Sequence, residues 1–246
     1  MRLGSNTVLI TGGASGIGFA LAERFLRAGS RVIVCGRRVE KLREAERRHP
    51  QLTTRACDLA DQSERLSLRD WCAGAFPEVN VLVNNAGIQH RIELTGEGAW
   101  AQARSEIAIN LEAVVHLSLL FIPRLRMQPH AAIVNITSAL AFAPLPLTPV
   151  YSATKAAVHS FTLSLRHQLS GTSIEVVEIL PPAVDTDLGG PGLHTFGVPV
   201  DELMDAVMPR LEAGDVEIAY GAAEQASRAS RAELDQIFAR LTQARR

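Results

Sequence analysis

An apolar run at residues 7–10 leads directly into a glycine-rich turn, and this junction constrains the fold of the chain more than any other stretch. A continuous apolar run of this length is typical of a strand covered on both faces. The turn contains Gly12, Gly16 and Gly18, and a helix is predicted over residues 19–28. Strand, glycine turn and helix N-terminus form a phosphate-binding geometry, because glycines let the backbone approach a pyrophosphate and the helix end offers free N–H groups. The alternative is a loop that merely requires flexible residues.

Strand-like and helix-like segments alternate along most of the chain. Apolar runs predict further strands at residues 31–35, 52–56, 79–83, 132–136 and 174–179. Apolar residues with helical spacing predict helices at residues 62–76, 105–127 and 151–170. This alternation is typical of an α/β fold with a doubly wound parallel sheet and helices on both faces, an αβα sandwich of three layers. With 246 residues, the chain has the length of a single domain, which we expect to span residues 1–246.

The composition argues against strongly charged partners and against a metal site. The chain has 25 basic and 26 acidic residues and a net charge of −1, so we expect neither nucleic acid nor a membrane as partner. Its cysteines and seven histidines show no metal-ligand spacing, and Cys35, Cys57 and Cys72 are interpreted as reduced thiols. No apolar run reaches the roughly 18 residues of a transmembrane helix, and the first strand leaves no room for a signal peptide. We therefore expect a cytoplasmic location.

Two arginines follow the second predicted strand. In a dinucleotide-binding fold, the end of this strand faces the adenosine ribose, where an acidic residue accepts from the 2′-hydroxyl of NAD. Here Gly36, Arg37 and Arg38 stand instead, which favours the additional phosphate of NADP. The alternative is that both arginines begin the basic, solvated helix that follows.

The ends of the next two strands carry small and polar residues. Asp58 is a candidate to accept from an adenine amino group or to cap the next helix, a role for which Asp61 competes. Residues 84–87, Asn-Asn-Ala-Gly, suit either close packing along a cofactor or a turn that ends the strand.

Tyr151 and Lys155 are one helical turn apart and lie on the same face of a predicted helix. A phenol has an ordinary pKa of about 10, and a cation held beside it favours the phenolate and moves that pKa toward neutrality. Read alone, such a pair is more often two neighbours on a solvated helix face.

Ser138 follows the carboxyl end of a predicted strand, which is where ligands bind in open α/β sheets. Asn110, inside an apolar helix, is either a satisfied core amide or a local break that exposes backbone groups to an ordered water.

Seven motifs occur in one order: Thr11-Gly-x-x-x-Gly-Ile-Gly18, Asp58-Leu59, Asn84-Asn-Ala-Gly87, Asn110, Ser138, Tyr151-x-x-x-Lys155 and Pro181…Thr186. Together they resemble the single-domain branch of the short-chain dehydrogenase/reductase family. The resemblance covers nearly the whole chain up to Thr186 and implies a Rossmann-type fold that binds NAD or NADP.

The resemblance implies a role for each matching residue. Tyr151 would protonate a carbonyl oxygen or accept a hydroxyl proton, and Ser138 would hydrogen-bond the same oxygen. Lys155 would hold the nicotinamide ribose and lower the pKa of Tyr151, and Asn110 would anchor a water that links Lys155 to solvent. The implied cofactor-binding residues are Gly12, Ser15, Gly16, Ile17, Gly18, Arg37, Arg38, Asp58, Leu59, Asn85, Ala86, Gly87, Tyr151, Lys155, Pro181, Val184 and Thr186.

The expected function is therefore an oxidoreductase that prefers NADP over NAD and transfers a hydride between nicotinamide and a small-molecule carbonyl or secondary alcohol. The alternative is a non-catalytic regulatory protein that binds NADP(H). Residues 139–149 are almost wholly apolar and are either a substrate pocket or core packing, and residues 187–213 are expected to include a substrate lid.

The chain departs from the family pattern at two places. Pro182 stands where the family usually has glycine, which stiffens the loop on the nicotinamide side. Residues 214–221 are followed by a helical tail at 228–246, where many relatives end in a glycine-rich strand that packs across a tetramer axis. We therefore expect a homodimer through the helices that begin near Ser105 and Tyr151, whereas a tetramer does not follow.

Overall fold

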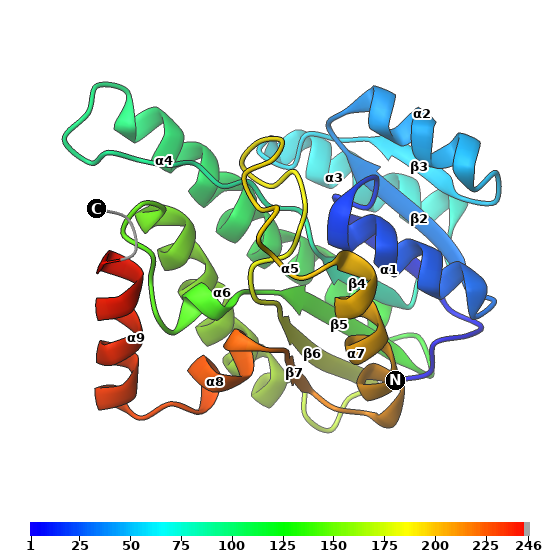
Figure 1. Cartoon of the computed structure of the whole chain (residues 1–246). Helices are drawn as coiled ribbons and strands as arrows, with labels where there is room; N and C mark the ends of the chain where they lie inside the picture. The colour runs from blue at the N-terminus through cyan, green and yellow to red at the C-terminus, as the bar shows by residue number, and fades with distance from the viewer. Residues whose placement is uncertain (244–246) are drawn as a thin grey trace.

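The fold is built on one parallel sheet. In the computed structural model, which describes residues 1–243, the strands are β1 (Thr7–Thr11), β2 (Arg31–Gly36), β3 (Thr53–Ala56), β4 (Val81–Asn84), β5 (Ala131–Ile136), β6 (Ile174–Leu180) and β7 (Glu217–Ala219). Their order across the sheet is β3-β2-β1-β4-β5-β6-β7 (Figure 1). The chain winds outward from β1 in one direction and from β4 in the other. Ligands bind outside the carboxyl ends of strands at such a reversal point.

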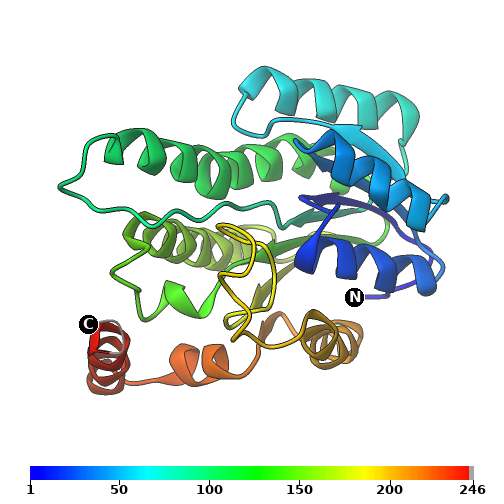
Figure 2. The same cartoon turned by 45° about the horizontal axis from the view of Figure 1, so that its top comes forward.

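The helices complete a three-layer sandwich. They are α1 (Gly16–Arg27), α2 (Val39–Arg48), α3 (Gln62–Ala75), α4 (Ala99–Ile107), the π-helix η1 (Ala108–Glu112), α5 (Ala113–Leu125), the 3₁₀ helix η2 (Ala139–Ala141), α6 (Pro149–Gln168), α7 (Val200–Ala213), α8 (Ala222–Arg228) and α9 (Arg231–Gln243). In Figure 2, α3, α5 and α6 lie on one side of the sheet, and α1 and α7 lie on the other. The predicted fold class is confirmed.

Each side of the sheet has its own core, because successive residues of a strand point to opposite faces. Val8 and Ile10 of β1 pack with residues of α1, α2 and α7. Leu9, which lies between them in sequence, packs on the other face with residues of α3, α5 and α6. The continuous apolar run at residues 7–10 thus arises because both faces of β1 are covered.

Several boundaries differ from those predicted. Helix α1 begins at Gly16 rather than at residue 19, because Ser15 is extended and lies at the N-cap position. The helix predicted at 105–127 begins at Ala99 and is interrupted by η1. Asp61, not Asp58, is the N-cap of α3, and its side chain accepts from the Ser63 N–H at 2.7 Å.

The segment at residues 187–213, for which a lid was predicted, has two parts of different character. Residues 187–199 form turns outside the regular elements. Helix α7 follows, and its Leu203, Met204 and Val207 are fully buried in the core with α1. A lid therefore stays a prediction for the turns, whereas α7 is part of the packed body.

The α4–η1–α5 run, Ala99–Leu125, is long and apolar enough to cross a membrane by length and mean hydropathy alone. However, 44% of its most apolar window is buried inside the protein, and a core helix of a soluble protein passes the same test. It is therefore weak evidence for a membrane span.

Candidate active site

Tyr151 is placed by the first turn of α6. Pro149 occupies the first helical position, where its fixed φ suits a helix and its missing N–H costs nothing. The Tyr151 side chain is only 6% exposed, and the preceding strand β5 brings Ser138 to its hydroxyl. Ser138 caps η2 through its Oγ, which accepts from the Leu140 N–H at 3.2 Å. The structure therefore brings these two predicted catalytic residues together.

Lys155 lies one turn further along α6 and is also buried. Its Nζ lies 5.6 Å from the centroid of the Tyr151 ring and donates to the main-chain oxygen of Ile136 at 2.7 Å. Burial lowers the pKa of Lys155 to about 8, whereas the nearby Glu178 carboxylate raises it. Burial of a cation in this way disfavours its charged form.

The pKa of Tyr151 moves in the direction opposite to the one predicted. Burial raises it to about 12, a hydrogen bond with Ser138 lowers it, and the Glu106 carboxylate raises it. Burial of the phenolate is the largest of these causes and Lys155 is not among them, so the lowering of this pKa by Lys155 stays a prediction.

Asn110 lies at the centre of η1, where the helix widens. Its side chain accepts from the Ile88 N–H at 2.9 Å and donates to the Ile88 oxygen at 2.8 Å. It also donates to the Thr154 hydroxyl at 3.3 Å, and that hydroxyl donates to the main-chain oxygen of Tyr151 at 2.7 Å. Single-turn π segments often mark functional sites. Asn110 thus satisfies its own polar atoms and joins the loop after β4 to the helix that carries Tyr151.

Glu106 is a site residue that sequence reasoning missed. It lies on α4, is fully buried, and accepts from the His90 N–H at 2.6 Å. Burial raises its pKa to about 7, whereas the N–H groups of His90 and Tyr151 lower it. Only the packing of α4 against α6 shows that its carboxyl faces Tyr151.

Several predicted cofactor residues that belong to other parts of the fold lie close to the glycine turn. A Cβ on Gly16 would lie 3.3 Å from Thr186 Cγ2, and one on Gly12 would lie 2.9 Å from the Ala86 Cα. At Gly18 an added Cβ would lie 2.3 Å from Asn85 Nδ2. The turn is therefore a cradle that a side chain would fill, as expected where a backbone must approach a dinucleotide.

The loop after β4 is fixed to the end of β1 by Thr11. Its hydroxyl accepts from the N–H groups of Asn85 and Ala86, each at 3.0 Å, and donates to the Val83 oxygen at 3.2 Å. A Cβ on Gly87 would lie 3.5 Å from Asn110 Oδ1 and 3.9 Å from Lys155 Nζ. The predicted residues 85–87 therefore run from the glycine turn to Asn110 and Lys155, two of the predicted catalytic residues.

Arg38 bridges to the glycine turn. Its guanidinium donates to Ser15 Oγ at 2.5 Å. Arg37 is exposed beside it at the end of β2, and Ile17 packs against the core at the start of α1. Arg38 therefore lies beside the glycine turn, and the binding of a 2′-phosphate by the two arginines stays a prediction.

Asp58 and Leu59 lie at the end of β3. Asp58 Oδ1 accepts from the Ala60 N–H at 3.0 Å in a local turn. Leu59 is buried, and its oxygen accepts from Arg65 at 2.7 Å. Arg65 is itself only 1% exposed and also pairs with Glu112 of η1. Sequence reasoning missed this buried arginine.

The loop after β6 carries the last predicted cofactor residues. The Pro181 oxygen accepts from the Ala139 N–H at 3.0 Å, next to Ser138. Val184 is buried and forms an isolated parallel bridge with Val198. This bridge closes the base of the 187–197 segment. Gly189 in that segment lies against Gln89, since an added Cβ would be 3.1 Å from the Gln89 oxygen.

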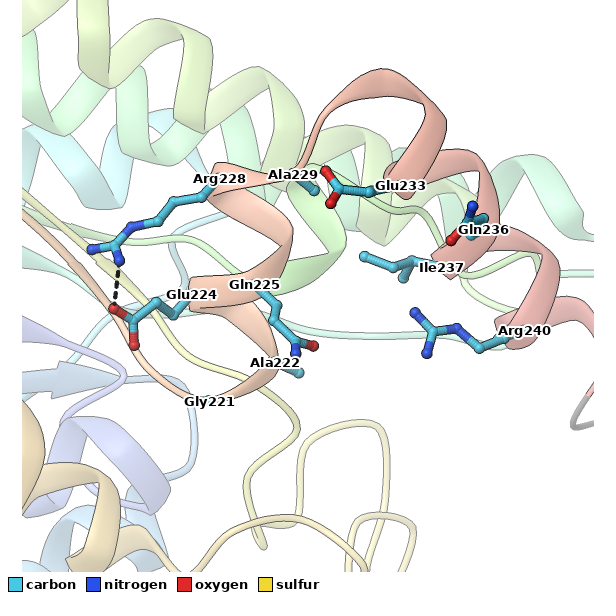
Figure 3. Close-up of a pocket in the computed structure, with 10 residues that line it drawn as sticks. All are labelled: Gly221, Ala222, Glu224, Gln225, Arg228, Ala229, Glu233, Gln236, Ile237 and Arg240. Atoms are coloured by element: carbon cyan, nitrogen blue, oxygen red, sulfur yellow. Dashed lines mark ion pairs between the residues drawn. The ribbon is translucent and has the colours of Figure 1, made fainter.

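A separate open groove of about 900 Å³ lies between α8 and α9 (Figure 3). It is lined by residues of these two helices and of the turn between them, including the Glu224–Arg228 ion pair at 3.1 Å. It contains none of the predicted catalytic or cofactor-binding residues. Within residues 1–243, no group of three or more His, Cys, Asp or Glu side chains is arranged to hold a metal ion.

Comparison with known proteins agrees with this geometry. Residues 6–193 match the family model described as short chain dehydrogenase. The chain belongs to the short-chain dehydrogenase family. It is 47% identical over 244 residues to an uncharacterised oxidoreductase, DltE, of Bacillus subtilis (strain 168), and the match covers 97% of each chain. It is also 35% identical over 187 residues to sulfoacetaldehyde reductase 2 of Chromohalobacter salexigens, covering 74% of each chain.

Solved structures of short-chain dehydrogenases share the same fold. A short-chain dehydrogenase from Burkholderia cenocepacia J2315 in complex with NADP superposes with a TM-score of 0.84 at 26% identity, covering 98% of this chain and 99% of the other. The family identified from seven sequence motifs is therefore confirmed. With it, the prediction that the chain is an oxidoreductase is confirmed as well.

Proposed function

We propose that this short-chain dehydrogenase prefers NADP(H) and interconverts a carbonyl compound and a secondary alcohol, with Tyr151 as general acid and base. The observation that carries the proposal is the buried Tyr151 phenol, hydrogen-bonded with Ser138 and one helical turn from Lys155. When bound, the nicotinamide cofactor supplies or accepts the hydride.

The side chains at the site have different roles in the proposed reaction. In reduction, the Tyr151 hydroxyl donates its proton to the carbonyl oxygen, and the Ser138 hydroxyl stabilises charge on the same oxygen. Tyr151 with a raised pKa holds its proton at neutral pH and is suited to act as the acid. Lys155 supplies a positive charge next to the phenol and binds the ribose hydroxyls. The water anchored by Asn110 stays a prediction, because the Asn110 amide is already bonded to Ile88 and Thr154.

The cradle formed by Gly12, Gly16 and Gly18 would hold the pyrophosphate, and Arg37 and Arg38 would bind the additional phosphate of NADP. Two observations support NADP: Arg38 already reaches Ser15 in the cradle, and the related structure from Burkholderia cenocepacia is described in complex with NADP. NAD remains the competing cofactor, and the ratio of the affinities for NADPH and NADH decides between the two.

A homodimer in the cytoplasm is the proposed working form. Helices α4, α5 and α6 present exposed apolar side chains, among them Trp100 at 70%, Leu119 at 57% and Leu163 at 44% exposure, on the helices expected to form the dimer. These exposed apolar side chains are candidates for burial in the dimer. The three cysteines are free and buried, which suits a reducing compartment.

The test is consumption of NADPH and, separately, NADH in the presence of a panel of aldehydes and ketones. The proposal predicts turnover that depends on the carbonyl compound and is faster with NADPH. Tight binding of NADPH without turnover of any panel member would instead favour the regulatory alternative, because a regulatory protein binds the cofactor without catalysing a reaction. Faster turnover with NADH would contradict the cofactor preference alone.

A further inference from the structure

Two ionisable residues lie behind the site and have no part in the reaction proposed above. Glu178, on β6, is fully buried. Its carboxylate accepts from the Thr137 hydroxyl at 2.6 Å, and both of its oxygens lie 3.0 Å from His159 Nδ1. The His159 side chain is 20% exposed, so this pair reaches from the centre of the sheet to the surface.

Both residues are close to Lys155 in the fold. His159 follows Lys155 by one turn of α6, and Thr137 follows Ile136, whose oxygen accepts from Lys155 Nζ. The Glu178 carboxylate raises the pKa of Lys155 against the effect of burial, and it also raises the pKa of His159. One buried anion is therefore shared by two bases.

A buried ammonium needs such an anion, because transfer of an unpaired charge from water into a protein interior is costly. Lys155 is 5% exposed, and its one side-chain hydrogen bond is to an uncharged main-chain oxygen. Around His159, the carboxylate of Glu217 on β7 raises its pKa and Arg166 on α6 lowers it, while the Phe142 ring packs edge-on at 4.7 Å. Glu178 is bonded on both sides of Lys155: to Thr137, which follows the acceptor Ile136, and to His159, one turn further along α6.

We propose that Glu178 is a positioning residue for the reaction: its buried carboxylate, shared with His159, keeps Lys155 charged beside Tyr151. The part of this proposal that concerns catalysis rests on the proposed function, whereas the charge of Lys155 is a property of the protein alone. In a purely structural role, Glu178 would contribute to folding without changing the titration of Lys155.

The sequence makes a direct measurement practical, because Lys41 and Lys155 are its two lysines. With ¹³Cε-labelled lysine, the pH titration of each ammonium can be followed by NMR, and Lys41→Arg identifies the Lys155 signal. We expect the pKa of Lys155 to be about 8 in the wild-type protein. In Glu178→Gln, which keeps the shape of the side chain and removes its charge, we expect this pKa to fall below the wild-type value.

Two further variants control for general disruption. Glu175→Gln removes a half-exposed carboxylate from the same strand and should leave the titration of Lys155 unchanged. His159→Gln removes the second base but leaves the carboxylate in place, so it should not lower the pKa of Lys155. This variant also tests the proposal if Glu178→Gln does not fold. A folded Glu178→Gln with unchanged Lys155 titration would overturn the proposal, as would a lowered pKa in His159→Gln.

The same change should appear in catalysis. In the direction of carbonyl reduction, the pH at which kcat falls on the alkaline side should be lower in Glu178→Gln by a similar amount, and unchanged in Glu175→Gln. The two readouts separate the two proposals. A shifted NMR titration without any NADPH turnover in the wild-type protein would support the inference and contradict the proposed function.

Discussion

Asn110 binds both main-chain groups of Ile88, with its Oδ1 accepting from the N–H at 2.9 Å and its Nδ2 donating to the oxygen at 2.8 Å. The amide therefore acts as a clamp between the π-helix and the loop that runs from the glycine turn to the site. Because both contacts with Ile88 are to its main chain, their effect does not depend on which side chain stands at residue 88.

Replacement of Asn110 should lower the stability of the folded protein. Asn110→Ala leaves the two main-chain groups of Ile88 without their partner, and we expect a loss of about 2 kcal/mol or more in the free energy of unfolding. The measurement is urea denaturation, with Gln102→Ala on the exposed face of α4 as the control. A loss no larger than that of the control would contradict the clamp.

Arg38 should determine the preference between the two cofactors. In Arg38→Ala, we expect the Kd for NADPH to rise by about tenfold or more and the Kd for NADH to change little, since a charge-assisted hydrogen bond contributes about 1.5–3 kcal/mol. Fluorescence titration measures both constants. Arg37→Ala tests the second predicted phosphate ligand in the same way, and Arg43→Ala, on the exposed face of α2, is the control. Equal effects of Arg38→Ala on both cofactors would contradict the phosphate contact.

Gly18 should not tolerate a side chain. A Cβ there would lie 2.6 Å from the Gly12 oxygen, which is main chain and cannot rotate away. We expect Gly18→Ala to lower the free energy of unfolding by about 1–3 kcal/mol and to weaken cofactor binding. Gly74→Ala, in α3 with no atom within 4 Å of the added Cβ, is the matched control. It should be neutral or stabilising by up to about 1 kcal/mol, because alanine favours a helix.

Glu106 should make stability depend on pH. Its pKa is raised to about 7 in the folded protein, so the folded state binds a proton that the unfolded state has already released between about pH 4.5 and 7. The contribution of Glu106 to stability is therefore complete at acidic pH and is lost as the pH rises through 7. We expect wild-type protein to lose on the order of 1–3 kcal/mol more than Glu106→Gln between pH 5 and 8.

Denaturation of both proteins at the two pH values gives this difference directly. The exposed Glu97→Gln should show the same pH dependence as the wild type. An identical pH dependence in Glu106→Gln would show that the buried carboxyl is not the group that titrates.

The fold and the family were predictable from the sequence because each rests on local patterns. The strand at residues 7–10 shows both of its buried faces in four consecutive apolar residues, and the glycine spacing shows where backbone must approach a ligand. Tyr151 and Lys155 are placed by a single helix, so their common face follows from their spacing alone.

The buried charges were not predictable in this way. Glu106, Arg65 and Glu178 are each defined by contacts between elements that are distant in sequence, and each looks like a surface charge in its local context. The direction of the Tyr151 pKa was missed for the same reason. It depends on how deeply the phenol is buried, which no local spacing shows.

The most direct test of the central claim is a comparison of wild-type protein with Tyr151→Phe, in which the phenol oxygen alone is removed. With a carbonyl compound that the wild type reduces, we expect kcat to fall by about 10²–10⁴-fold while the affinity for NADPH and the thermal stability stay near those of the wild type. Retention of most of the wild-type turnover by folded Tyr151→Phe would contradict the assignment of Tyr151 as the general acid.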